Sequence, residues 1–186
     1  LAAAQQLRSA LDKAGIALRT DADLLAEAWP DRPALPARVV YEHQAPQAVQ
    51  TRAQRLARVR EAMARHGATH HFISTVDDIA WITNLRGGDV EYNPVFLAHL
   101  MLDAQRATLF VGAGKIDPTL ATRLQQDGIA LADYAAAAEA LRTLPPGATL
   151  LIDPRRLTLG FRQRVSDGVH VVDAINPSTL FKSRKS

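Results

Sequence analysis

The chain has 186 residues and 47% of them are hydrophobic, which is enough for a domain with a core and excludes global disorder. The formal charge of +3 is too small for a strong basic field, and no apolar run approaches the roughly 20 residues that cross a bilayer. No cysteine is present, which excludes disulfides, a thiolate nucleophile and cysteine-bound zinc.

We expect the chain to be a piece of a longer polypeptide. It begins at Leu1 rather than at a methionine, and it ends in a charged helical pattern that has no stop signal. The lack of cysteine suits a reducing compartment.

Residues 1–48 are expected to be the end of a preceding domain followed by a stiff linker. Residues 2–14 have helical composition and stop at Gly15, residues 16–18 fit a short strand, and residues 23–29 fit a short helix. Prolines then prevent long regular structure, at Pro30, Pro33, Pro36 and Pro46.

Residues 49–176 alternate between helical and strand patterns, with one hairpin turn at 103–106. The expected helices are 51–66, a segment that begins near Thr75, 117–128, an alanine-rich segment after Asp133, and 158–165. The expected strands are 70–74, 95–102, 108–111, 129–131, 149–152 and 169–172. This order predicts an α/β fold, a mixed β-sheet with helices on both faces.

The most informative segment runs from Asp77 to Phe96. An apolar helix face leads into Arg86-Gly87-Gly88, where a helix should end, and a polar loop follows. From spacing alone two interpretations stay open. The loop is either a rigid connection in which Arg86 pairs with Asp89 or Glu91, or a recognition loop that uses its polar side chains.

Several other patterns have a plain structural interpretation that we favour over a chemical one. Five arginines on one expected helix read as a solvated face rather than a phosphate-binding stripe: Arg52, Arg55, Arg58, Arg60 and Arg65. His70 and His71 are adjacent on an expected strand, so they face opposite sides and do not share a metal.

Three further features also have a structural interpretation. Asp77 and Asp78 fit the first turn of a helix, where carboxylates meet the helix dipole. Residues 112–115 lack the spacing of a phosphate loop and read as a strand-to-helix turn. Trp81 shares a helix face with Leu85 and is expected in the core.

The segment from Asp77 to Phe96 resembles a motif in the middle domain of three-domain, cytosolic-type Xaa-Pro aminopeptidases, which are creatinase/prolidase-like metallopeptidases. A second match is the stretch 24–36, with Pro30 where that family usually has threonine. The tail at Asn176-Pro177-Ser178 looks like the lead-in to the catalytic domain. The resemblance therefore covers nearly the whole chain.

This resemblance implies a fold and a domain division. The fold would be that of the creatinase/prolidase N-terminal domain, which is ribonuclease H-like. Residues 49–176 would form this non-catalytic α/β domain. Residues 177–186 would start a linker helix, capped by Ser178, to a missing C-terminal catalytic domain.

The resemblance also implies a function for the parent protein, which would release the N-terminal residue of peptides that have proline second. The parent would use two divalent metal ions, with manganese expected, and would be a homodimer. No position here matches the family's metal ligands, so neither catalytic nor metal-binding residues are expected and this chain alone should be inactive. Its partners would be the missing N-terminal and catalytic domains and a peptide at the interdomain cleft, with no nucleic acid and no membrane.

The substrate-proximal loop implied by the resemblance contains Arg86, Asp89, Tyr92 and Asn93. Arg86 would hold an anionic or carbonyl group, because a guanidinium makes bidentate contacts to oxygen. Tyr92 and Asn93 would line the wall of the cleft.

Two alternatives of other classes remain. The chain could belong to a pita-bread protein that has no metal ligands and binds other proteins. A weaker alternative is nucleic-acid binding through the arginine-rich helix.

Overall fold

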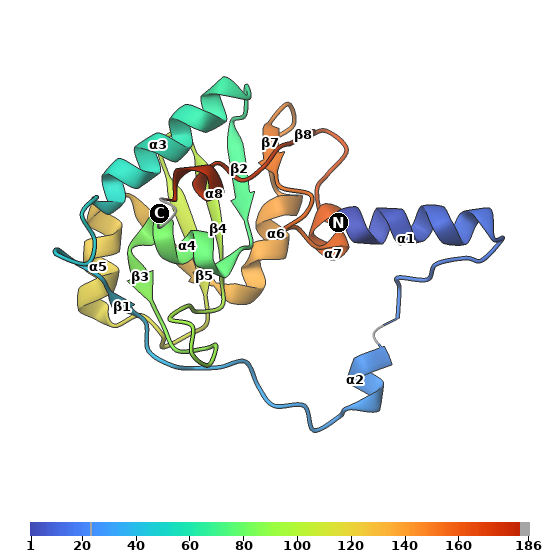
Figure 1. Ribbon diagram of the computed structural model, residues 1–186, viewed down its shortest axis with the longest axis horizontal. Helices are drawn as coiled ribbons and strands as arrows, with labels where there is room; N and C mark the ends of the chain where they lie inside the picture. Colours follow the sequence, from blue (N-terminus) through green and yellow to red (C-terminus); the bar gives the residue numbers. More distant parts are fainter. Residues whose placement is uncertain (23, 183–186) are drawn as a thin grey trace.

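The computed structural model describes residues 1–22 and 24–182. A six-stranded mixed sheet forms the centre, with strands in the order β6-β5-β4-β2-β7-β8 (Figure 1). Its strands are β2 (His70–Ile73), β4 (Ala98–Asp103), β5 (Ala107–Val111), β6 (Ile129–Asp133), β7 (Thr149–Ile152) and β8 (His170–Asp173). Strand β4 runs antiparallel to both of its neighbours, and the remaining pairs are parallel.

Helices cover both faces of this sheet. The described helices are α1 (Ala2–Lys13), α2 (Leu24–Ala28), α3 (Arg52–Arg65), α4 (Val76–Thr83), α5 (Pro118–Gln126), α6 (Ala137–Arg142), α7 (Leu159–Arg162) and α8 (Pro177–Phe181), with a 3-10 turn at Tyr134–Ala136. One buried cluster lies under α3, α4 and α5, and a second lies under α6 and α7. The predicted α/β fold with helices on both faces is confirmed.

Local sequence signals place several of these helices correctly. Thr51 caps α3 and forms a capping box with Gln54, and Asp117 caps α5 ahead of a proline at the first position. The adjacent Asp117 and Pro118 predict the cap of α5 from the sequence, whereas the capping box of α3 is a finding of the structure.

The structure corrects the expected end of the motif helix. Helix α4 stops at Thr83, not at Arg86-Gly87-Gly88, because Asn84 adopts a left-handed conformation with φ of 56°. Leu85 and Arg86 then form the short strand β3, which pairs antiparallel with β1 (Tyr41–Glu42).

Other boundaries also differ from expectation. Residues 16–18 form no strand, and the strand expected at 95–102 begins only at Ala98. The cap of α8 is Asn176, whose side chain accepts from the Ser178 backbone N–H, so Ser178 is not the cap. Helix α8 ends at Phe181, and the part of the expected final helix at 183–186 lies outside the described residues.

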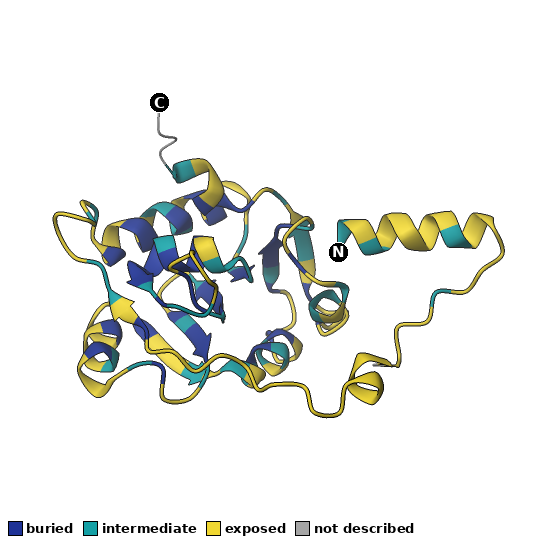
Figure 2. Cartoon of the chain, turned by 60° about the horizontal axis from the view of Figure 1, so that its bottom comes forward, coloured by how far each residue is buried: buried dark blue, intermediate teal, exposed yellow. Residues whose placement is uncertain are grey.

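The N-terminal segment lies beside the domain rather than in it. Helix α1 projects outward, α2 stands apart, and both are almost entirely exposed (Figures 1 and 2). The segment contacts the domain again at Pro36, whose carbonyl accepts from Lys115 Nζ, and at Val40, which is buried in the core and whose N–H donates to the Lys115 carbonyl at 2.8 Å. The division of the parent at residue 48 stays a prediction.

We predict that the buried His99 makes stability depend on pH. Its ring packs against Phe72, Tyr134 and Phe161 at centroid distances of 5.6, 4.8 and 4.6 Å. Burial lowers the pKa of His99 from 6.5 to about 4, so the folded state binds this proton at a lower pH than the unfolded state does. Its contribution is complete above pH 6.5 and is lost as pH falls toward 4, by about 2 kcal/mol.

Urea unfolding at pH 7 and pH 4.5 measures this effect, with His99→Leu as the control. The variant should lose part of the difference between the two pH values. It should keep the part due to His71, whose pKa burial also lowers. An unchanged pH dependence in His99→Leu would contradict the assignment.

Candidate functional site

The loop after β3 is closed by backbone contacts at its base. The Asp89 N–H donates to the Val95 carbonyl at 3.1 Å, and Val90 and Asn93 form an isolated bridge. A Cβ on Gly87 would lie 2.7 Å from the Phe96 Cβ, so only glycine fits there. These contacts hold the two ends of the loop together and restrict its conformation.

A buried ion pair holds the loop from inside. Lys115 Nζ contacts Asp89 Oδ2, and the two side chains are 2% and 0% exposed. The same carboxylate oxygen accepts the Leu97 N–H at 2.7 Å, and Lys115 Nζ also donates to the Pro36 carbonyl at 3.4 Å. The pair therefore joins the loop, the turn after β5 and the extended segment before β1.

This ion pair defines the roles of two residues that sequence reasoning treated differently. Asp89 belongs to the predicted substrate-proximal loop, but its side chain points inward and supports the loop. Lys115 lies in the segment interpreted as a plain turn. The turn is present, but its lysine is a buried partner, 26 residues away in sequence from Asp89.

Tyr92 and Asn93 lie at the outer end of the loop. Tyr92 is 98% exposed and has a φ of 58°, a conformation that is unfavourable for a bulky L-residue. Asn93 is also exposed. The loop thus presents an aromatic ring and an amide to solvent from a rigid base.

Arg86 folds back onto the carboxyl end of α4. One of its terminal nitrogens, Nη1, donates to the carbonyls of Ala80 and Leu85 at 2.7 and 2.8 Å. The alternative in which Arg86 pairs with Asp89 or Glu91 is wrong. Arg86 donates to backbone carbonyls, and Asp89 contacts Lys115. The Arg86 side chain is half-buried at the base of the loop.

Two arginines of α3 reach the same end of α4. Arg52 Nε donates to the Thr83 carbonyl at 2.7 Å, and Arg55 Nη1 donates to the Trp81 carbonyl. The interpretation of the five arginines as a solvated face is therefore wrong for Arg52 and Arg55, which are 3% and 8% exposed. The reason is that unsatisfied carbonyls and the negative end of a helix dipole attract guanidinium groups.

The charges around these arginines are unevenly balanced. Arg52 contacts the carboxylates of Glu42 and Asp127, whereas no carboxylate of the described residues forms an ion pair with Arg55 or Arg86. Burial lowers the pKa of Arg55, and the nearby Arg86 charge lowers it further. Burial and then the Arg86 charge also lower the pKa of His43.

Trp81 lies under one of these guanidinium groups. The Arg55 Cζ is 4.7 Å from the Trp81 ring centroid, a cation–π contact. The indole packs against the core cluster, so the expectation of a core tryptophan is confirmed.

The predicted acidic pair at the start of α4 has a second role. Both carboxylates lie in the first turn, as expected. Asp78 is also buried, accepts from Asn176 Nδ2 at 3.0 Å, and contacts Lys182 Nζ at 2.5 Å. This network fastens α8 to α4.

His70 and His71 behave as strand alternation predicts. His71 is buried, with Nδ1 2.9 Å from the Leu151 carbonyl, while His70 is half-exposed. Within residues 1–22 and 24–182, no group of three or more His, Asp or Glu side chains could hold a metal ion. The described residues therefore do not fit a two-metal centre.

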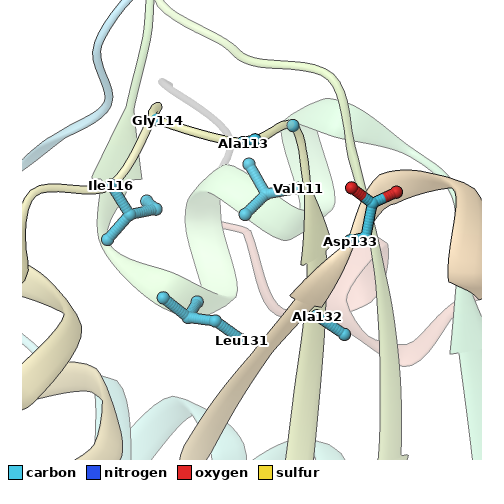
Figure 3. A pocket seen from close by; sticks show the side chains of 8 residues that line it. Val111, Ala113, Gly114, Ile116, Leu131, Ala132 and Asp133 are labelled. Atoms are coloured by element: carbon cyan, nitrogen blue, oxygen red, sulfur yellow. The ribbon is translucent and has the colours of Figure 1, made fainter.

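A surface pocket lies where β5 and β6 end (Figure 3). Val111, Ile116 and Leu131 make it largely apolar, and the Asp133 carboxylate lies at its edge. Asp133 already accepts the Ala135 N–H at 2.8 Å as the cap of the following turn. The carboxylate at the pocket edge thus has a structural role as a cap.

Comparison with known proteins assigns this fold to a class. Residues 31–186 match the family described as creatinase/prolidase N-terminal domain. The chain belongs to this family.

No helix in the described part of the chain is long and apolar enough to cross a membrane.

The relatives with this domain are aminopeptidases. The chain is 34% identical over 134 residues to Xaa-Pro aminopeptidase 1 of Dictyostelium discoideum, covering 72% of this chain and 21% of that protein. It is 32% identical over 161 residues to aminopeptidase P2 of Arabidopsis thaliana, covering 84% and 23%. The chain thus spans about a fifth of the length of these relatives.

A solved structure shares the fold across most of the chain. It is the X-prolyl aminopeptidase from Caenorhabditis elegans, described as a cytosolic enzyme with a di-nuclear active site. The TM-score is 0.80 at 18% identity, covering 93% of this chain and 29% of that one. This likeness shows the fold.

We predict that breaking the buried ion pair destabilises the domain strongly. Lys115→Met leaves the Asp89 carboxylate buried without a cation and should cost about 3–5 kcal/mol in urea unfolding. Asp89→Asn strands the Lys115 charge and should cost a similar amount.

The double variant Lys115→Met with Asp89→Asn removes both charges. It should cost clearly less than the sum of the two single variants, because neither charge is then left unpaired. Strictly additive costs would show that the two charges do not interact.

Proposed function

We propose that this chain is the non-catalytic middle domain of an Xaa-Pro aminopeptidase. The relatives that share its sequence are aminopeptidases of which the match covers only 21% and 23%, and this observation carries the proposal. The parent would release the N-terminal residue that precedes a proline. It would act in the cytoplasm and as a homodimer.

The metal chemistry of the parent would lie in its C-terminal domain. A two-ion site needs several converging carboxylates and histidines, and the described residues provide no such group. When bound there, two divalent ions, with manganese expected, would activate water and polarise the scissile carbonyl. The present chain would contribute position and access rather than chemistry.

The loop with Arg86, Asp89, Tyr92 and Asn93 would form part of the rim of the catalytic cleft. Tyr92 and Asn93 face outward, and Asp89 holds the loop in shape through Lys115. Arg86 has further N–H groups beyond those used on the α4 carbonyls, and these would meet an anionic or carbonyl oxygen. A rigid rim of this kind selects short peptides because folded chains do not pass it.

The proposal predicts where hydrolysis occurs. The natural full-length protein, assayed with an Xaa-Pro-Xaa tripeptide and manganese, should release the first residue, and the 186-residue chain should not. Activity in neither would favour the alternative of a protein-binding module. Activity of the short chain alone would contradict the proposed division of labour.

Tyr92→Ala tests the rim in the full-length protein. We expect kcat/KM for the tripeptide to fall by about three- to tenfold, because the exposed ring would lose contact with bound peptide. Unfolding free energy should change by less than about 0.5 kcal/mol, since the ring contacts solvent. Glu91→Ala, one residue away and also exposed, is the matched control and should leave kcat/KM unchanged. Equal effects of the two variants would remove Tyr92 from the rim.

A further inference from the structure

Arg55 and Arg86 both reach the carboxyl end of α4, where they donate to the neighbouring carbonyls of Trp81 and Ala80. No carboxylate of residues 1–22 and 24–182 lies within ion-pair distance of either one. Arg55 is 8% exposed and its buried Nε has no hydrogen-bond partner. A charge this far from water is costly when it is not paired.

Arg52 shows that this fold can neutralise a buried arginine with carboxylates of its own chain. It lies one turn before Arg55 on the same helix and is buried to a similar degree. Its guanidinium contacts two carboxylates, Glu42 and Asp127, and one backbone carbonyl. The imbalance at Arg55 is therefore local and is not a general property of α3.

The surroundings of the pair favour a carboxylate. The Arg55 Cζ lies over the Trp81 ring, 4.7 Å from its centroid. Burial and then the Arg86 charge lower the pKa of both Arg55 and His43, so these groups lie in a region of positive charge that is partly removed from water. Guanidinium groups bind carboxylates through paired N–H donors, and such charge-assisted bonds are among the stronger hydrogen bonds in proteins.

The position of α8 indicates where that carboxylate comes from. Helix α8 lies against α3 and α4, and the Phe181 ring is 4.5 Å from the Arg58 guanidinium, one turn along α3 from Arg55 (Figure 1). Lys182 is tied to α4 through Asp77 and Asp78. The last described residues, Phe181 and Lys182, therefore lie on the helix pair α3 and α4, and Phe181 lies one turn of α3 from Arg55.

We propose that Arg55 and Arg86 form a carboxylate-binding site that receives an acidic side chain of the polypeptide following residue 186 in the parent. The identity of the occupant rests on the proposed function, whereas the carboxylate site itself does not. The contact would lock the domain against its neighbour. It would also fix the base of the 87–94 loop, because Arg86 lies there.

Arginine modification by phenylglyoxal, followed by mass spectrometry of each arginine, tests both parts. In the 186-residue chain, sodium acetate should slow modification of Arg86 several-fold in a saturable way. Sodium chloride at equal ionic strength should not. Arg65, which is exposed on α3, is the internal control and should react at the same rate in both salts.

Variants keep the site testable without relying on one substitution. Arg55→Lys keeps the charge over Trp81 but removes the planar fork, so the acetate protection of Arg86 should weaken. Arg65→Gln should leave that protection unchanged. Circular dichroism of each variant shows whether it is folded. Equal protection by acetate and chloride would overturn the carboxylate site.

The natural full-length protein tests the occupant. Arg86 should react slowly there even without acetate, and added acetate should have no further effect. If acetate protects Arg86 equally in the long and short proteins, the site is open and the proposed occupant is wrong. Peptidase activity of the same sample is scored separately, so a failure of the proposed function is distinguishable from a failure of this site.

Discussion

The buried ion pair between Asp89 and Lys115 is the interaction on which the candidate site depends. Removing two charges from water is costly, and their mutual attraction offsets that cost only with good geometry and added hydrogen bonds. The Leu97 N–H and the Pro36 carbonyl supply those bonds. One contact thereby positions the loop, the turn after β5 and the segment that leads into β1.

The carboxyl end of α4 is the second fixed point. Its carbonyls would be unsatisfied at the helix end, and three arginines from outside the helix donate to them. Helix α4 has only eight residues, so these contacts and its packing on the core matter more for its stability than its own hydrogen bonds do. The same contacts bring positive charge to the base of the loop. Arginines that stabilise the end of α4 thereby also form the proposed carboxylate-binding site.

The sequence predicts those features that local chemistry decides. The cap at Asp117, the alternation of helices and strands along the chain, and the motif at 77–96 are all visible from neighbouring residues. It does not predict that Arg52 and Arg55 are buried, because their partners are the carbonyls of another helix, 31 and 26 residues away. Lys115 is missed for the same reason, since nothing near it marks Asp89 as its partner. The early end of α4 depends on the left-handed conformation of Asn84. Asparagine tolerates this conformation but does not require it, so the sequence alone does not predict it.

Hydrogen exchange of the Leu97 backbone N–H in the 186-residue chain tests the central claim most directly. This amide donates to the buried Asp89 carboxylate, which is the group that Lys115 neutralises. If the ion pair fixes the loop, the Leu97 amide should exchange as slowly as the amides of the core strand β4. The amide of the exposed Tyr92 should exchange fast. Exchange of Leu97 at the rate of Tyr92 would show that the loop opens independently and would contradict the account.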